Sequence, residues 1–180
     1  SRGLGDVYKR QISGISTKTY TGKNITQSVK VKYNGKTLKS GTDYTVSYSS
    51  NKNVGTATVK ITGKGQYGGT VSKTFKINPA KQKIQKLTAK SKAFFIDWAQ
   101  KGSATGYEVQ YATNSKFTGA KKLDVANNKT DKMTISKLSA NKKYYVKVRS
   151  YTLVKGTKYF GEWSAVKSCL LYTSPSPRDA

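Results

Sequence analysis

The chain has 180 residues, a length that suits one large domain or two small ones. Lysine and arginine number 34 against 8 aspartate and glutamate residues, so the formal net charge is +26. The chain has no histidine and a single cysteine, which excludes histidine-based catalysis and Cys/His metal centres.

The two ends of the chain, residues 1–11 and 169–180, resemble translated sequencing-adapter DNA. Back-translation of the first end gives DNA whose reverse complement, read in a shifted frame, encodes the Cys-Leu-Leu-Tyr-Thr-Ser-Pro-Ser-Pro-Arg of the second. We therefore expect both ends to be artefacts that contribute nothing to the fold, and the remainder to be a piece of a longer reading frame. Setting them aside also removes Cys169 and with it any thiol chemistry.

Residues 12–79 are predicted to form an all-β domain, because short stretches of alternating apolar and polar residues are separated by turn residues. Asn34-Gly35 marks a tight hairpin turn. No stretch of useful length has a helical period, and frequent short strands are typical of a β-sandwich. The predicted strands cover residues 28–33, 43–48, 56–61 and 71–77.

Four short sequences in this domain resemble an immunoglobulin-like repeat of Gram-positive surface proteins. They are Tyr20-Thr-Gly22, Gly41-Thr-Asp43-Tyr44, residues 51–57 and residues 63–69. The resemblance implies tandem repeats on a secreted or wall-attached polypeptide, with no catalytic motif. Residues 63–68 also fit G-x-G-x-x-G, but the strand pattern that follows, where a dinucleotide site needs a helix, favours a hairpin loop.

Pro79 separates the two predicted domains, because proline cannot donate to a strand ladder. Beyond it, residues 80–168 show seven strand-like segments. Trp98, Tyr144 and the segment Gly161-Glu-Trp163-Ser164 resemble the core tryptophan, the corner tyrosine and the last-strand entry of a fibronectin type III domain. The segments cover residues 84–89, 93–98, 107–111, 122–125, 133–138, 144–150 and 164–168.

The positive charge has two interpretations. A nucleic-acid reader carries a basic patch and favours arginine, whose planar fork grips bases and phosphates. Here Arg149 is the only arginine between residues 12 and 168, and lysines spread along the chain at outward positions. We therefore favour a solvated lysine surface, which also protects strand edges, over specific nucleic-acid binding.

The carboxylates of residues 12–168 are scattered and form no predicted acid–base pair or calcium cage. Asp97 and Glu108 are expected to lie outward on opposite sheets. Residues 153–161 are predicted to be a loop whose Lys155, Lys158, Tyr159 and Phe160 form a candidate ligand-binding site. The alternative is that one of the two aromatic residues packs inward and caps the core.

The fold class is thus all-β, with two tandem immunoglobulin-like and fibronectin type III sandwiches. The resemblances imply a non-catalytic extracellular spacer or adhesion segment of a Gram-positive cell-surface or secreted protein. The alternative is an accessory segment of a secreted hydrolase, such as a glycoside hydrolase, peptidase or wall amidase, whose catalytic domain lies outside this chain. Expected partners are anionic cell-wall polymers or glycans and neighbouring domains. We expect no cofactor, no specific nucleic acid and no membrane span.

Overall fold

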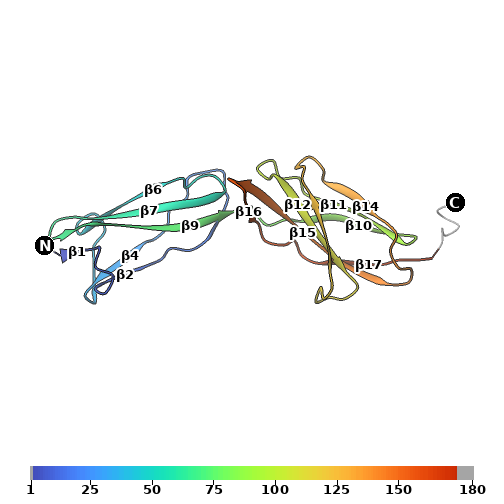
Figure 1. Cartoon of the computed structure of the whole chain (residues 1–180), viewed down its shortest axis with the longest axis horizontal. Helices are drawn as coiled ribbons and strands as arrows, with labels where there is room; N and C mark the ends of the chain where they lie inside the picture. The colour runs from blue at the N-terminus through green and yellow to red at the C-terminus, as the bar shows by residue number, and fades with distance from the viewer. Residues whose placement is uncertain (1, 174–180) are drawn as a thin grey trace. The chain divides into compact units, whose positions relative to one another are not determined.

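The computed structural model describes residues 2–173, and the chain divides into two compact units, Ser1–Asn78 (unit 1) and Pro79–Ala180 (unit 2). Every regular element of the described residues is a β-strand, so the all-β prediction is confirmed (Figure 1). Residues 174–180, part of the predicted C-terminal artefact, lie outside the described residues.

Unit 1 contains two main sheets and a short two-stranded one. One main sheet has the order β2-β4-β5 and the other β3-β9-β7-β6, while β1 pairs in parallel with β8. In Figure 1, β6, β7 and β9 run alongside one another. The strands are β1 Arg2–Gly3, β2 Arg10–Ser13, β3 Lys18–Thr19, β4 Lys30–Tyr33, β5 Lys36–Thr37, β6 Tyr44–Ser49, β7 Gly55–Gly63, β8 Tyr67–Gly68 and β9 Thr70–Asn78.

The strand alternation read from the sequence places the core of unit 1. On β7, Ala57, Val59 and Ile61 are fully buried, whereas the residues between them face outward. The predicted Asn34-Gly35 turn joins β4 to β5, with positive φ angles of 52° and 80° at its two residues, as a type I′ hairpin requires. A strand, β9, follows residues 63–68, which supports the hairpin-loop interpretation of that glycine-rich sequence.

The prediction that residues 1–11 lie outside the fold is wrong for the described part of that segment. The backbone of β1 pairs with β8, and β2 pairs with β4. Leu4 is completely buried against Val31 and Ile61. The physical reason is that an apolar side chain beside an open core packs there whatever the origin of its codons. Only the turn before β2 is open, and there Tyr8 is 97% exposed.

Unit 2 is a sandwich of two sheets that enclose one core. One sheet has the order β10-β11-β14, and the other β13-β12-β15-β16, with β17 also paired to β15. The strands are β10 Ile84–Lys90, β11 Ala93–Trp98, β12 Gly106–Ala112, β13 Lys121–Val125, β14 Lys132–Ile135, β15 Lys143–Val154, β16 Thr157–Phe160 and β17 Lys167–Leu170.

The core of unit 2 is built by the inward residues that alternation predicts. Phe94, Ile96 and Trp98 of β11 are fully buried and face Tyr107 and Val109 of β12. The Trp98 and Tyr107 rings meet edge to face with centroids 5.5 Å apart. Burying each large side chain of this kind contributes about 1.5–3 kcal/mol, and unit 2 has no disulfide to assist.

The C-terminal segment is also part of the fold, so the prediction for residues 169–180 is wrong where the structure describes them. β17 extends through Cys169 to Leu170, and Leu171 is 1% exposed within the core. Leu171 donates its N–H to the Lys142 carbonyl at 3.0 Å and accepts from the Asn141 N–H at 3.1 Å. The segment completes an edge that would otherwise expose apolar side chains and unpaired backbone groups.

Tyr144 occupies the corner position that the resemblance implies. Its ring is buried in the core, and its hydroxyl accepts a hydrogen bond from the Ser139 N–H at 3.0 Å. The hydroxyl thus satisfies a donor in the turn that leads from β14 to β15.

Tyr144→Phe should destabilise unit 2 by about 1–2 kcal/mol, because it leaves the Ser139 N–H without its partner while keeping the ring. Urea unfolding with separate probes for the two units would measure this, and unit 1 should unfold at an unchanged urea concentration. Equal shifts for both units would contradict independent cores.

Candidate binding surface

The segment that carries the predicted ligand-binding residues is a hairpin, so the prediction of a loop over residues 153–161 is wrong. β15 continues through Val154, and β16 returns from Thr157 to Phe160 in antiparallel register. The reversal needs only Lys155 and Gly156, whose φ angles of 49° and 83° are those of a tight two-residue turn.

The four predicted residues lie in different surroundings on this hairpin. Lys155 is exposed at the tip, whereas Lys158 places its Nζ 3.1 Å from Asp124 Oδ2 and 4.4 Å from the centre of the Tyr151 ring. Tyr159 is half-buried. Phe160 lies with its ring centre 3.6 Å from Cζ of Arg149.

Phe160 therefore fits neither alternative considered from the sequence. It does not cap the core, because it packs on the outward side of the sheet, edge to face with Tyr151 at 5.9 Å. It is also not free for a ligand, since the Arg149 guanidinium covers one face of its ring. Of the predicted set, the two lysines are exposed, and Lys158 is already paired with Asp124.

Five residues form a continuous cation–π stack on this outer surface, which we call the ladder: Phe117, Lys147, Trp163, Arg149 and Phe160. Lys147 Nζ lies 4.3 Å from the Phe117 ring centre and 4.5 Å from that of Trp163. Arg149 Cζ lies 4.3 Å from Trp163. Lys147 and Arg149 are alternate residues of β15 and so share its outward face. The stack joins β15 and β16 to the segments at residues 117 and 163, which lie outside the strands.

Ionic contacts extend the ladder across the sheet. Glu108 on β12 lies opposite Arg149, and their Oε1 and Nη2 atoms are 3.2 Å apart. Gln110 donates to the same Glu108 oxygen at 3.0 Å. The two charged side chains are 23% and 16% exposed, so water screens their attraction only partly.

A second polar contact lies beside the hairpin. The Tyr151 hydroxyl donates to Asp124 Oδ1 at 2.7 Å. This hydrogen bond, with Lys158 nearby, lowers the pKa of the Asp124 carboxyl. Burial and the same carboxylate raise the pKa of Tyr151 to about 12. The hydroxyl therefore stays protonated at neutral pH and acts as a fixed donor.

In the sequence, Trp163 is a family landmark only, and no pattern there predicts the ladder. The available signal was the pair of basic residues at alternate positions of one strand, Lys147 and Arg149, with aromatic residues in the flanking turns. The surface supplies stacking and fixed charges. As expected, Asp97 and Glu108 lie on different sheets of unit 2.

Within residues 2–173, no group of three or more histidine, cysteine, aspartate or glutamate side chains is placed to hold a metal ion. Over the same range, no helix has the length and apolar character needed to cross a membrane.

Comparison with known proteins bears on unit 2. Residues 79–167 match the family model of the fibronectin type III domain, whereas no curated protein matches the chain. Similar solved structures include a myokine, with 11% sequence identity and a TM-score of 0.44 over 53% of this chain and 99% of that chain. The FN1–FN3 domains of chicken CNTN1 are 15% identical, with a TM-score of 0.43 over 67% of this chain and 42% of that chain. The FN5 domain of Drosophila Lar is 19% identical, with a TM-score of 0.40, and covers 53% of this chain and 99% of its own. Residues 79–167 thus match the fibronectin type III family model, and unit 2 has the β-sandwich fold of that family.

Proposed function

We propose that the chain is a non-catalytic spacer and adhesion segment of a Gram-positive cell-surface or secreted protein, and that its lysines contact anionic wall polymers. Fibronectin type III domains are typically binding or spacer modules and commonly occur in extracellular proteins. In unit 1, the resemblance to a Gram-positive surface repeat supports the same setting.

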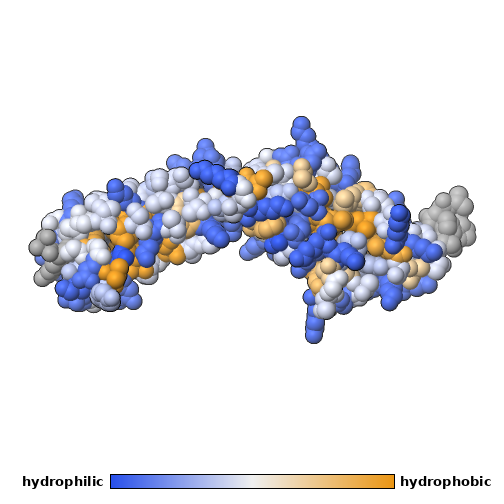
Figure 2. Space-filling view, viewed as in Figure 1, coloured by the Kyte–Doolittle hydropathy of each residue, from blue (hydrophilic) through white to orange (hydrophobic). Residues whose placement is uncertain are grey.

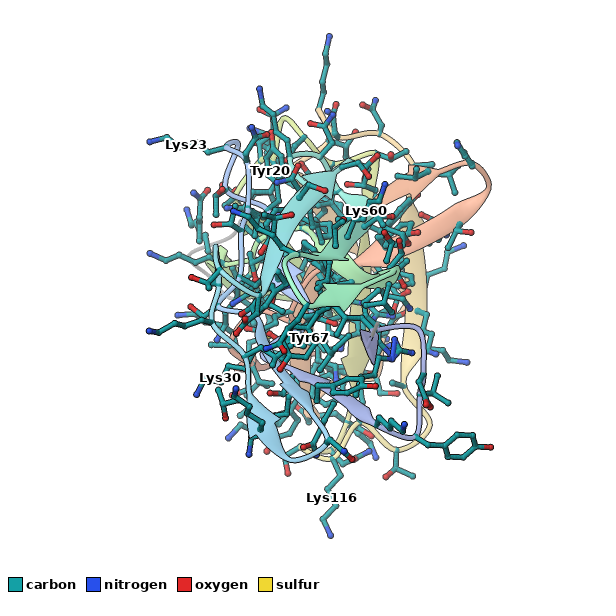
Figure 3. All side chains as sticks on the ribbon, turned by 90° about the vertical axis from the view of Figure 1, so that its left-hand side faces the viewer. Tyr20, Lys23, Lys30, Lys60, Tyr67 and Lys116 are labelled. Atoms are coloured by element: carbon teal, nitrogen blue, oxygen red, sulfur yellow. The ribbon has the colours of Figure 1, made fainter. Side chains whose placement is uncertain are left out.

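The observation that carries the proposal is the excess of unpaired cations. The chain has 34 lysine and arginine residues, yet only Arg149 and Lys158 form ion pairs among the described residues. Hydrophilic residues cover much of the visible surface (Figure 2), and the labelled Lys23, Lys30 and Lys116 side chains extend away from the ribbon (Figure 3). Scattered cations of this kind attract a polyanion without selecting its sequence.

Titration of the full chain with teichoic acid, DNA and an uncharged glycan at two salt concentrations tests this function. We expect both polyanions to bind, and the affinity to fall steeply with salt as each neutralised phosphate releases a counterion. At about 0.15 M salt the Debye length is about 8 Å, so binding should be weak. Salt-resistant binding to the uncharged glycan that Tyr159→Ala abolishes would instead indicate a carbohydrate site on the hairpin.

Two matched variants separate charge from shape. Lys23, Lys30, Lys60 and Lys116 are all exposed. Changing all four to glutamine should lower the affinity and the salt dependence for both polyanions alike, whereas changing them to arginine should preserve both. A glutamine variant that binds as well as the unaltered chain would contradict the electrostatic proposal.

A further inference from the structure

A pocket of about 360 Å³ opens at the end of the unit 2 sandwich that holds the tyrosine corner. Its floor includes Tyr111 and Tyr144, whose rings pack with Phe94 at the end of the core. One wall is the connection between β12 and β13, and the other is the turn after β14. The volume lies near the lower end of the range for small-molecule sites, which suits a ligand about the size of one sugar ring.

The pocket lining contains charged and hydroxyl side chains that are available to a ligand. Two lysines, Lys121 and Lys137, stand at the pocket, and neither forms an ion pair within residues 2–173. Over the same range, no hydrogen bond occupies the Tyr111 hydroxyl, and burial raises the pKa of this group, which keeps it protonated. The lining also carries the hydroxyl side chains of four exposed residues, Thr113, Thr118, Ser136 and Ser139.

The wall from β12 to β13 is held in place before any ligand arrives. Asn114 makes three hydrogen bonds across it: its Oδ1 accepts from the N–H groups of Lys116 and Thr118, and its Nδ2 donates to the Thr118 carbonyl. Phe117 in the same turn is the first member of the ladder, against Lys147. A fixed wall lowers the entropy lost on binding.

The opposite wall is anchored to the core. The Ser139 N–H donates to the Tyr144 hydroxyl at 3.0 Å, and the Leu138 N–H donates to the Lys92 carbonyl at 2.9 Å. Lys137 has a positive φ of 59°, an uncommon conformation for a residue other than glycine. Both walls and the floor are thus fixed by contacts that lie behind the pocket surface.

We infer that this pocket binds one acidic sugar residue of a glycan. The hydroxyl groups can donate to and accept from sugar hydroxyls, and the tyrosine rings offer an apolar floor. The two lysines supply charge for a carboxylate or phosphate on the ring. The site is distinct from the hairpin and from diffuse contact with polyanions, and it does not depend on the chain being a spacer.

Amide chemical shifts of the full chain, recorded in about 0.15 M salt to weaken diffuse binding, test the inference. The probes are D-glucuronate, D-glucose 6-phosphate, D-glucose and inorganic phosphate. We expect one or both acidic sugars to shift the amides of residues 113–121 and 136–139, and glucose and phosphate to bind about tenfold more weakly. The tighter acidic sugar identifies the source as a carboxylated or a phosphorylated glycan. Equal binding of phosphate or of neutral glucose, or no shifts at these amides, would overturn the inference.

Variants locate the site. Tyr111→Phe keeps the ring packing and removes one hydroxyl, so acidic-sugar affinity should fall about two- to tenfold. The pair Lys121→Gln and Lys137→Gln should lower it about tenfold and leave the weak glucose binding unchanged. The control pair, Lys86→Gln and Lys129→Gln, removes the same charge from exposed positions outside the pocket lining. Equal losses for both pairs would show that only net charge matters and would overturn the site.

Discussion

Leu171→Ala should destabilise unit 2 by about 2–5 kcal/mol, the range found when a buried leucine is truncated. Leu171 is 1% exposed and packs in the same core as Val146 and Phe94. Its removal would leave a cavity where the chain closes the sandwich, and the neighbouring backbone bonds to Lys142 and Asn141 hold that cavity open. Urea unfolding of the full chain, followed separately for the two units, measures the effect.

The adjacent residue supplies the control. Leu170 is 64% exposed, so Leu170→Ala removes the same atoms from the same C-terminal segment but should change the free energy of unfolding by less than about 0.5 kcal/mol. If both substitutions had equally small effects, the C-terminal segment would not pack in solution as it does here. The C-terminal segment would then contribute nothing to the stability of unit 2.

The sequence predicted the parts of the fold that local alternation and turn chemistry determine. Trp98 and Tyr107 lie inward on strands whose residues alternate, and Asn34-Gly35 forms the turn that this pair of residues predicts. The burial of Leu4 and Leu171 differs from the prediction for a different reason, because the DNA origin of the two end segments says nothing about whether they pack. Packing depends on apolar surface and backbone pairing alone, and both segments supply these.

The candidate sites were harder to predict, because their residues come together only through the register between strands. Arg149 meets Glu108 across a strand pair and Trp163 across a turn, contacts that no short sequence pattern encodes. The pocket similarly combines Tyr111 of β12 with Ser136, which follows β14 of the other sheet. The sequence does not predict the hairpin over residues 153–161, because Lys155-Gly156 is a weaker turn signal than Asn-Gly.

Arg149→Ala is expected to destabilise unit 2 by about 2–4 kcal/mol, from two causes. It leaves the Glu108 carboxylate, which is 16% exposed, without its cation. The expected destabilisation from this cause is smaller than for a fully buried ion pair, because water reaches both groups. It also removes the cation between the Phe160 and Trp163 rings, and such contacts contribute about 0.5–2 kcal/mol each. Urea unfolding gives the total, and near-ultraviolet circular dichroism should report the altered surroundings of Trp163.

Arg149→Lys separates the two causes. Lysine keeps a charge for Glu108 but lacks the planar guanidinium that stacks on both rings, so about half of the stability should return. If Arg149→Lys were as stable as the unaltered chain, charge alone would matter and the stack would contribute nothing. If Arg149→Ala lowered the free energy of unfolding by less than about 0.5 kcal/mol, the ladder would contribute little to the stability of unit 2. Phe117 belongs both to the ladder and to the turn that forms one wall of the pocket. If Arg149→Ala destabilises the ladder, amide hydrogen exchange should therefore become faster at Thr118 and stay unchanged at Ser139.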